Sequence, residues 1–312
     1  AISFNFKKIM KTVLIFGGSG FIGQHIIRKI AKNGHRIIVP YQRQINEAKL
    51  RIYGNTGQII PLHFNSFNDS NIIDLIKNAN VILNCKTLWD EKKTSFEVGI
   101  KSFNSELVNI IRENNANSQF IFFSGIGIDE KSKSKRSLSI YETEQYIAKN
   151  LSNSIIMKPG IIIGGGDKFL GNLLFLFKFS FFIPLFGDGK SRFQPVFIDD
   201  VISSIDRIIH NKILGNHIYE LASDNVFTYR ELYSYIVFCL GIKRIIISIP
   251  IFLVKIAVYI LDKISLSPLN NEQLNLFTKD NVVSNKYKNL RNLDIIPQDL
   301  REKIKKIVKK NI

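Results

Sequence analysis

Cysteine, histidine and acidic residues are scarce in this chain, and their scarcity excludes several kinds of site. The 312 residues include two cysteines, Cys85 and Cys239, which lack metal-ligand spacing. They predict buried thiols in a reducing compartment. The 5 histidines show no metal-ligand spacing to cysteine or aspartate, so no metal site is expected. The sequence also contains no nucleophile elbow and no Walker lysine.

Long uninterrupted apolar runs are missing as well. Segments 169–186 and 245–261 are rich in apolar residues, but lysine and proline interrupt both. Each is shorter than the ~20 residues that a bilayer core requires, so no transmembrane helix is expected. They predict helices that cap a sheet, or helices on a membrane surface with snorkelling lysines. Residues 1–10 have no long apolar core and predict no secretory signal.

Negative charge is outweighed, with a formal net charge of +17 at pH 7. The basic residues are densest in segment 301–312, and a second run occupies 131–136. These runs are compatible with solvated surfaces, or with attraction to an anionic membrane surface or an acidic protein. Because no recognition module accompanies the charge, nucleic acid is not expected as a partner.

Strands and helices alternate in the first half of the chain. Amphipathic helices are expected at 20–33, 69–78, 94–115 and 138–151, between apolar strands at 12–17, 35–41, 58–63, 80–84, 118–124 and 154–163. This alternation predicts an α/β fold, a Rossmann-type doubly wound parallel sheet over residues 11–163. Residues 1–10 form an N-terminal tail. Residues 164–312 are expected to form a smaller, mainly helical region on the substrate or partner side, with returning sheet elements and the basic tail.

A glycine-rich turn joins the first expected strand to the first expected helix. The spacing is Gly17-x-x-Gly20-x-x-Gly23. Glycines in this context permit a tight turn, close approach of backbone N–H groups to phosphates, and packing of the helix on the strand. The turn predicts a dinucleotide site formed by Gly17, Gly18, Ser19, Gly20, Phe21, Ile22 and Gly23.

The end of the second expected strand indicates which dinucleotide is bound. An NAD site has an acid there that accepts hydrogen bonds from the ribose 2′-hydroxyl. The sequence instead runs Val39-Pro40-Tyr41-Gln42-Arg43, with no acid before Glu47. Arg43 is suited to a 2′-phosphate, so NADP(H) is favoured over NAD(H), which stays an alternative. Asn65, after the third strand, is expected to meet the adenine.

Further motifs resemble a known family. Segment 184–201, Pro-Leu-Phe-Gly-Asp-Gly-Lys-Ser-Arg-Phe-Gln-Pro-Val-Phe-Ile-Asp-Asp-Val, resembles the late motif of extended and atypical short-chain dehydrogenase/reductases, which are NAD-dependent epimerase/dehydratase-like. One subgroup contains the Rossmann-type accessory subunit of respiratory complex I (NADH:ubiquinone oxidoreductase) and its bacterial relatives. The chain resembles this subgroup at Ile37–Tyr41, Lys158-Pro159, Pro268, Gln273, Leu276 and Asp280-Asn281-Val282-Val283-Ser284.

The resemblance implies cofactor contacts at Asn84, Ser124, Lys158 and Pro159. It also implies a catalytic tyrosine with a lysine four residues later, a pair in which the ammonium lowers the phenol pKa. Counting back from Glu144, the tyrosine position holds Arg136 and the lysine position holds Ile140. The remaining catalytic candidates are weak: Ser124 in the family's serine position, Tyr141, and Lys86 as a substitute lysine near the nicotinamide.

Two functional hypotheses follow. The first is a non-catalytic NADP(H)-binding subunit, or an assembly or stability factor, associated with respiratory complex I. It would sit peripherally on the cytoplasmic face of a bacterial inner membrane or on the matrix side of the mitochondrial inner membrane, beside subunits of the complex. The alternative is an active NAD(P)-dependent reductase or epimerase acting on a sugar-nucleotide or a quinone/isoprenoid-like substrate. A peripheral membrane protein with an empty cleft is a third possibility.

Overall fold

The structure is a computed structural model that describes residues 10–132, 134–211, 213–263 and 271–310. Residues 1–9 of the expected N-terminal tail, and Pro268 of the family motif, lie outside the described residues.

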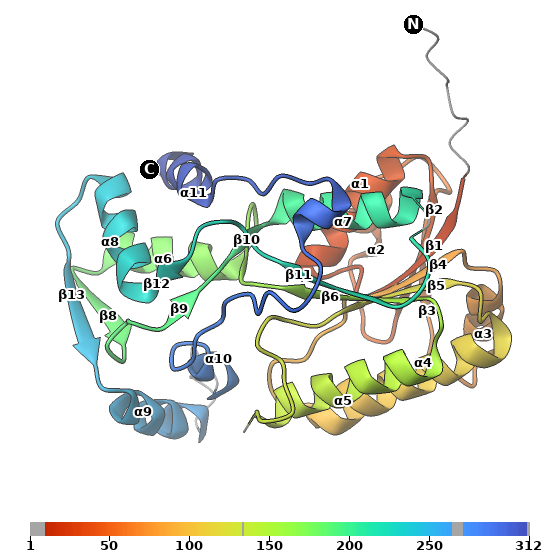
Figure 1. Ribbon diagram of the computed structural model, residues 1–312, viewed down its shortest axis with the longest axis horizontal. Coiled ribbons are helices and arrows are strands. Elements are labelled where there is room, and N and C mark those ends of the chain that lie inside the picture. Colours follow the sequence, from red (N-terminus) through yellow and green to blue (C-terminus); the bar gives the residue numbers. More distant parts are fainter. Residues whose placement is uncertain (1–9, 133, 212, 264–270, 311–312) are drawn as a thin grey trace, which may run out of the picture.

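A seven-stranded sheet forms the centre of the described part of the chain, in the order β11-β6-β5-β4-β1-β2-β3 (Figure 1). Every neighbouring pair is parallel. The strands are β1 (Thr12–Phe16), β2 (Arg36–Tyr41), β3 (Ile59–His63), β4 (Val81–Asn84), β5 (Gln119–Phe123), β6 (Ser154–Pro159) and β11 (His217–Leu221). The predicted Rossmann-type doubly wound sheet is confirmed.

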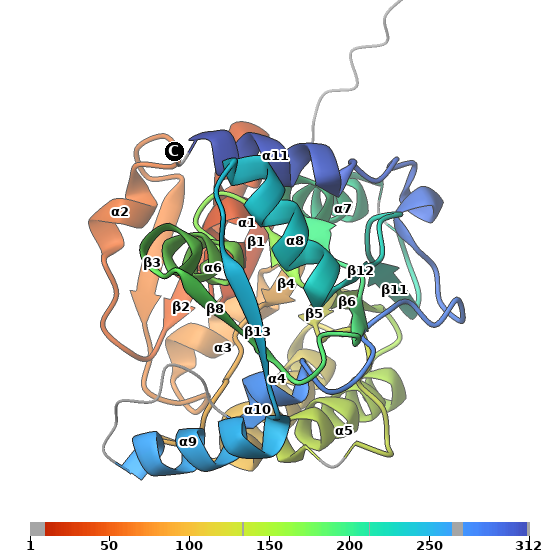
Figure 2. The same ribbon diagram turned by 90° about the vertical axis from the view of Figure 1, so that its left-hand side faces the viewer.

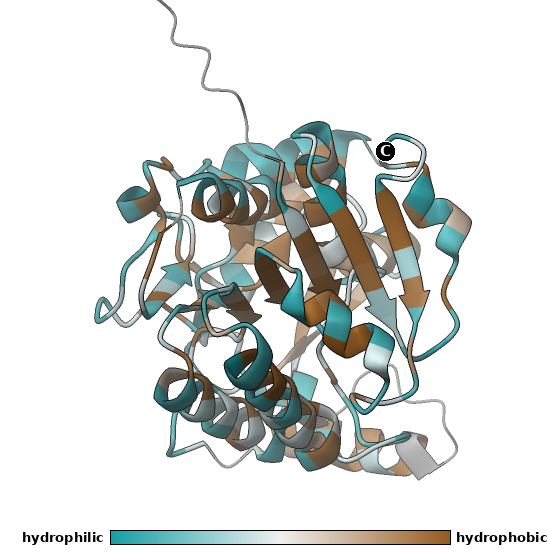
Figure 3. Ribbon diagram, turned by 90° about the vertical axis from the view of Figure 1, so that its right-hand side faces the viewer, coloured by the Kyte–Doolittle hydropathy of each residue, from teal (hydrophilic) through white to brown (hydrophobic). Residues whose placement is uncertain are grey.

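Helices cover both faces of the sheet (Figure 1). One face carries α1 (Phe21–Lys32) and α7 (Ile198–Asn211), and the other carries α3 (Ser70–Lys77), α4 (Phe103–Asn114) and α5 (Lys135–Asn150). Alternation along β1 explains the two cores. Val13 and Ile15 enter the first core, whereas Leu14 and Phe16 enter the second. Figure 3 shows the apolar strands between helices whose outer surfaces are hydrophilic.

A smaller region lies beyond the carboxyl ends of the strands (Figures 1 and 2). It contains α6 (Lys168–Phe179), β8 (Phe182–Phe186), α8 (Tyr229–Leu240), β13 (Ile245–Ile249), α9 (Ile251–Lys263) and α10 (Asn271–Asn275). Within it, β8 pairs with β13. Two more short pairings join β7 (Ile162–Ile163) to β10 (Val196–Phe197), and β9 (Arg192–Phe193) to β12 (Phe227–Thr228). The chain then passes through η2 (Leu290–Leu293) to α11 (Leu300–Lys310).

The local structure departs from expectation at three places. The strand expected at 154–163 is broken between β6 and β7. At the break, only glycine fits at position 160, because a Cβ there would lie 2.0 Å from the carbonyl oxygen of Gln194. The helix expected at 94–115 starts with a π-helical segment, η1 (Glu97–Ser102). A short helix, α2 (Glu47–Arg51), was not expected. Among the described residues, no helix combines the length and apolar character needed to cross a bilayer.

Candidate functional site

The turn between β1 and α1 is too crowded for side chains at its glycines. Gly17 has a φ of +78°, and a Cβ there would lie 2.6 Å from the backbone nitrogen of Lys86. A Cβ on Gly18 would lie 2.7 Å from Cγ1 of Val39. A Cβ on Gly23 would lie 2.4 Å from the carbonyl oxygen of Gly17. The absence of side chains therefore lets α1 start directly against the turn, as the spacing of the glycines requires.

The first turn of α1 is open to an anion. Gly20 is the N-cap residue; no side chain of a described residue caps this end, and the first turn contains no acidic residue. Ser19 and Gly20 are exposed, and Phe21 and Ile22 are partly buried. Unpaired N–H groups and the helix dipole make such an end electropositive. The arrangement is the one in which phosphates are bound at helix N-termini.

Three loops meet beside this turn, after β2, β3 and β4. Gln42 joins them: its Nε2 donates to the Asn65 carbonyl at 3.3 Å, and its Oε1 accepts from Lys86 Nζ at 3.2 Å. Arg43 follows Gln42 and is exposed. Lys86 Nζ also lies 3.6 Å from the centroid of the Phe103 ring. Sequence reasoning missed Gln42, and its position directly before Arg43 was the only signal for it.

Positive charge at these loops is not balanced by a carboxylate. Glu47, the first acid after β2, accepts hydrogen bonds from the Tyr41 hydroxyl and, at 2.9 Å, from Arg51 Nη2. Within the described ranges, neither Arg43 nor Lys86 forms an ion pair with a carboxylate. Lys86 is exposed as a residue, but its ammonium lies over the Phe103 ring. Desolvation of this group, followed by the charge of Arg43, lowers the pKa of Lys86 to about 8. This corner of the site therefore has cations suited to an anionic ligand.

Asn84 shapes the loop after β4. Its side chain is buried, with Nδ2 donating to Asn104 Oδ1 at 2.6 Å and Oδ1 accepting from the Lys86 backbone N–H at 2.9 Å. These bonds hold the backbone of Lys86 against Gly17. Asn84 thus acts on the site through the geometry of the loop, and its direct contact with a cofactor stays a prediction.

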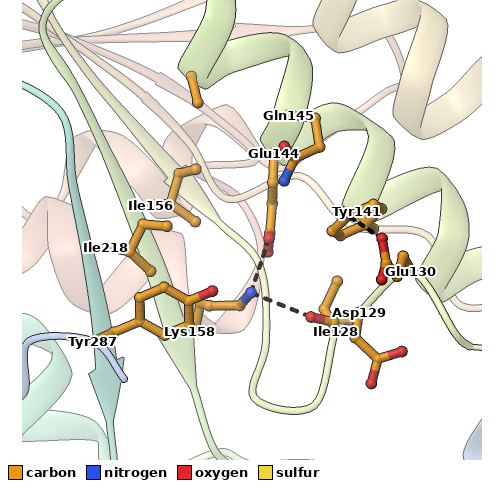
Figure 4. A pocket seen from close by; sticks show the side chains of 11 residues that line it. Ile128, Asp129, Glu130, Tyr141, Glu144, Gln145, Ile156, Lys158, Ile218 and Tyr287 are labelled. Atoms are coloured by element: carbon orange, nitrogen blue, oxygen red, sulfur yellow. Dashed lines mark hydrogen bonds and ion pairs between the residues drawn. The ribbon is translucent and has the colours of Figure 1, made fainter. Parts of the chain in front are cut away.

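A buried ion pair lies behind the end of β5 (Figure 4). Lys158 Nζ is 2.8 Å from Glu144 Oε2, and both side chains are 4% exposed. The Ser124 hydroxyl donates to the other carboxylate oxygen, Glu144 Oε1. Burial raises the pKa of Glu144, and the contacts with Lys158 and Ser124 oppose that rise. Ser124 is therefore directed toward α5, and the Lys158 ammonium is occupied by Glu144 and by the Ile128 carbonyl at 3.3 Å.

A cavity of about 240 Å³ opens beside this ion pair, between α5, β6 and β11 (Figure 4). Its lining includes Glu130, Tyr141 and Tyr287. Pro159 closes β6 next to it, and its carbonyl accepts from the Ile126 N–H at 3.1 Å. The cavity lies near the β11 edge of the sheet, whereas Gln42 and Arg43 follow β2 near the opposite edge.

The two positions of the family's acid/base pair hold different chemistry. Arg136, in the first turn of α5, donates from Nε to the Leu88 carbonyl at 2.7 Å and from Nη2 to Thr87 Oγ1 at 3.0 Å. Its guanidinium lies 3.9 Å from the centroid of the Trp89 ring. Ile140, one turn later, is 4% exposed and packs in the core. Neither side chain can replace a phenol with an ammonium beside it.

The three weak catalytic candidates are not brought together. Ser124 is bonded to α5, as described above. The Tyr141 hydroxyl lies 3.5 Å from Glu130 Oε2, and burial and this carboxylate raise the pKa of Tyr141. A raised pKa makes proton transfer near neutrality harder. Lys86 reaches Gln42 across β1, on the side away from β5 and Ser124.

Neither cysteine takes part in a cluster of potential ligands. Among the described residues, no three histidine, cysteine, aspartate or glutamate side chains gather in a way that would hold a metal ion. Both cysteines are free thiols and are partly rather than fully buried. The Cys85 thiol donates to the Phe16 carbonyl at 3.2 Å, and burial raises its pKa to about 12.

Comparison with known proteins finds a matching family and named relatives. Residues 13–222 match the model of the NAD dependent epimerase/dehydratase family. The mitochondrial NADH dehydrogenase (ubiquinone) 1 alpha subcomplex subunit 9 of Arabidopsis thaliana is 26% identical over 300 residues, covering 92% of this chain and 74% of the relative. The subunit of the same name from Dictyostelium discoideum is 25% identical over 296 residues, covering 93% and 82%.

Solved structures show the same fold at low identity. The dTDP-glucose 4,6-dehydratase of Bacillus anthracis, in complex with NAD, superposes with a TM-score of 0.71 at 15% identity and covers 96% of both chains. An epimerase of Methanothermobacter thermautotrophicus gives a TM-score of 0.70 at 13% identity, covering 97% of this chain and 92% of its own. The predicted resemblance is confirmed: the chain belongs to the NAD dependent epimerase/dehydratase family.

Proposed function

We propose that this protein is an NADP(H)-binding subunit, or an assembly or stability factor, of respiratory complex I (NADH:ubiquinone oxidoreductase). We propose further that it holds the nucleotide without turning it over. The two relatives that support this proposal carry the name of complex I subunits and match more than nine-tenths of this chain, 92% and 93%.

The geometry of the glycine turn fits a dinucleotide. The space that a Cβ on Gly17 or Gly23 would fill is taken by neighbouring backbone, and the uncapped start of α1 presents N–H groups to two linked phosphates. Arg43 would hold a 2′-phosphate, and Asn65 would meet the adenine. Because the loop after β2 lacks the acid that binds a ribose 2′-hydroxyl, NADP(H) fits better than NAD(H). When bound, the nicotinamide supplies hydride-transfer chemistry.

The missing proton donor is the observation that carries the non-catalytic part of the proposal. Reduction of a carbonyl requires an acid near the hydride acceptor. Burial lowers the pKa of Arg136 to about 10, which leaves a cation at neutral pH, and its donors are occupied by Thr87 and Leu88. Ile140 has no ionisable group and cannot take part in proton transfer. A tightly held nucleotide would instead stabilise the native state by mass action.

One end of the molecule supports attachment to a membrane. We call it the apolar end, and it is formed by large side chains of α6, β8, α8, β13, α9 and the residue before β8 that are 43–75% exposed: Phe175, Phe179, Phe181, Phe182, Phe238, Ile245, Ile247, Phe252, Leu253, Ile256, Tyr259 and Ile260. Figure 2 shows β13, α8 and α9 on this side. Exposed apolar patches of this extent mark interaction sites.

The charges of the apolar end favour an anionic lipid surface as its partner. Segments 168–186 and 238–261 contain five basic residues, Lys168, Lys178, Lys243, Arg244 and Lys255, and no aspartate or glutamate. Basic side chains beside exposed apolar groups match the interface of an anionic bilayer. We propose that this end rests on the inner membrane beside complex I, on the matrix side in a mitochondrion or the cytoplasmic face in a bacterium.

Two measurements on the native protein test the proposal. Mass spectrometry of the ligand released from the purified protein is expected to find NADP(H), and a native gel of solubilised membranes is expected to show co-migration with complex I. NADPH oxidation with carbonyl, sugar-nucleotide and quinone-like substrates is expected to stay at the level of the protein-free control. Sustained turnover, abolished by substitutions around Ser124, would establish an active reductase or epimerase instead.

A further inference from the structure

The side chain of Lys86 passes over the carboxyl end of β1. In the sheet, β1 lies between β4 and β2. The backbone nitrogen of Lys86, after β4, is the atom nearest to a Cβ built on Gly17, at 2.6 Å. At the other end of the same residue, Nζ donates to Gln42 Oε1, after β2, at 3.2 Å. The backbone of Lys86 therefore lies at the glycine turn, and its ammonium lies at Gln42, the residue directly before Arg43.

Neutral groups hold the ammonium in this place. The Phe103 ring, which is 8% exposed, lies under Nζ with its centroid at 3.6 Å. Gln42 is fixed in turn by its bond to the Asn65 carbonyl. A ring face and an amide oxygen orient a cation without neutralising it. The nearby carboxylate of Glu47 is bonded to Tyr41 and Arg51.

Arg43 and Lys86 form no ion pair with a carboxylate of the described residues, so a bound anion would relieve the repulsion between their charges. Arg43 and Lys86 are close enough for the charge of one to disfavour the charge of the other. A phosphate monoester carries close to two negative charges at neutral pH. Arginine offers it a planar fork, and lysine offers a point charge from another direction. A ribose 2′-hydroxyl gives neither cation this compensation.

We infer that Lys86 binds the 2′-phosphate of NADP(H) together with Arg43, and that this pair of cations determines the preference over NAD(H). The inference rests on the proposed binding of NADP(H) and adds a second ligand to it from a different loop. Gln42 is a positioning residue that aims the lysine.

Titration of the nucleotide-free protein with NADPH and with NADH tests the inference. Lys86→Met keeps an apolar stem over Phe103 and removes the charge. It is expected to weaken NADPH binding roughly tenfold or more, as for the loss of one charge-assisted hydrogen bond, and to leave the NADH affinity unchanged. Lys86→Arg is expected to keep most of the preference. Lys305→Met, which removes an exposed charge from α11, is the matched control and is expected to change neither affinity.

The possible failures are distinguishable. Wild-type protein that binds neither nucleotide overturns the proposed function as a whole. Wild-type protein that prefers NADPH, with Lys86→Met showing the same preference, overturns the role of Lys86 alone. An equal loss for NADPH and NADH also overturns it, because Lys86 would then act on a part that both nucleotides share. Lys86→Gln provides a second neutral variant, and 2′,5′-ADP against 5′-ADP repeats the comparison on the adenosine half.

Discussion

At the scale of single residues, two lysines near the carboxyl ends of β4 and β6, two strands separated by β5, have opposite surroundings. Lys158 is buried with Glu144 at 2.8 Å, and its charge is compensated within the protein. Lys86 has an aromatic ring, an amide and the arginine Arg43 as neighbours, and no carboxylate of the described residues pairs with it. The first lysine ties two elements together, whereas the second is available to an anionic ligand. This difference assigns Lys86, and not Lys158, to the nucleotide phosphate.

The lowered pKa of Lys86 predicts how selectivity depends on pH. Burial and the charge of Arg43 lower this pKa to about 8, so the side chain is a cation below that pH and loses its charge above it. The 2′-phosphate, with a second pKa of about 6, stays ionised over this range. The ratio of NADPH to NADH affinity is therefore expected to fall between pH 7 and 9.5. Lys86→Arg is expected to flatten the profile, because arginine keeps its proton, and an unchanged slope would contradict this explanation.

Residue roles that depend on local spacing could be predicted from the sequence. The glycine turn and the missing acid after β2 are patterns within a few consecutive residues. The contact between Lys86 and Gln42 joins residues 44 positions apart, and it depends on β1 lying between β4 and β2. For this reason the sequence could not predict the contact of Lys86 with Gln42, and a place for Lys86 near the nicotinamide stays a prediction.

At the scale of elements, strand and helix positions followed from hydrophobic period and glycine placement. Gly34, for example, has a φ of +79° and ends α1 as expected of a C′ glycine. The two-residue strands β9, β10 and β12 were not predictable, because each exists only through its partner, whereas β7 falls within the strand expected at 154–163. The close approach of the distant Gln194 carbonyl to Gly160, at the break between β6 and β7, was not predictable either.

The ion pair between α5 and β6 predicts a strong coupling between these elements. Lys158→Met leaves the Glu144 carboxylate buried without its cation, and Glu144→Gln leaves the Lys158 ammonium buried without its anion. Each is expected to cost about 3 kcal/mol in the free energy of unfolding at pH 7. The free energy of unfolding lost by the double variant is expected to be smaller than the sum of the two single losses, and the difference is expected to exceed about 1 kcal/mol. Urea unfolding measures these values, with the exposed Lys149→Met on the same helix as control.

The pH dependence gives this prediction a second measurement. Burial raises the pKa of Glu144, and Lys158 opposes the rise, so Lys158→Met raises the pKa further. A folded-state pKa above the unfolded value gives stability that is complete at low pH and is lost as pH rises through the folded pKa. The loss caused by Lys158→Met is therefore expected to shrink as pH falls from 7 toward 5. A loss independent of pH would mean that packing, and not charge, accounts for it.

At the scale of the whole molecule, the nucleotide site and the apolar end occupy different parts. The glycine turn lies at the carboxyl edge of the sheet, and the apolar end belongs to the smaller region beyond it (Figures 1 and 2). Sequence alone predicted both apolar segments but left open whether they cap the sheet or face a membrane. In the fold, α6 of the first segment packs into the core on the sheet through Leu170 and Phe177. In the second segment, α9 buries Val254 and Val258 in a separate small cluster, while Phe252 and Ile256 stay 60% and 53% exposed.

Binding to lipid vesicles is the prediction that belongs to this scale. The protein is expected to sediment with vesicles that contain anionic lipid, more weakly with neutral ones, and less as salt screens the basic residues. Replacing Phe252 and Ile256 together by serine is expected to weaken binding roughly a hundredfold, since each contributes about 1.5 kcal/mol when transferred from water. The matched control is Ile296→Ser, an 82% exposed residue between η2 and α11, outside the apolar end. If the paired substitution and its control behave alike, or if lipid charge has no effect, the proposed contact with an anionic bilayer is wrong, because that contact depends both on buried apolar side chains and on the negative charge of the lipid.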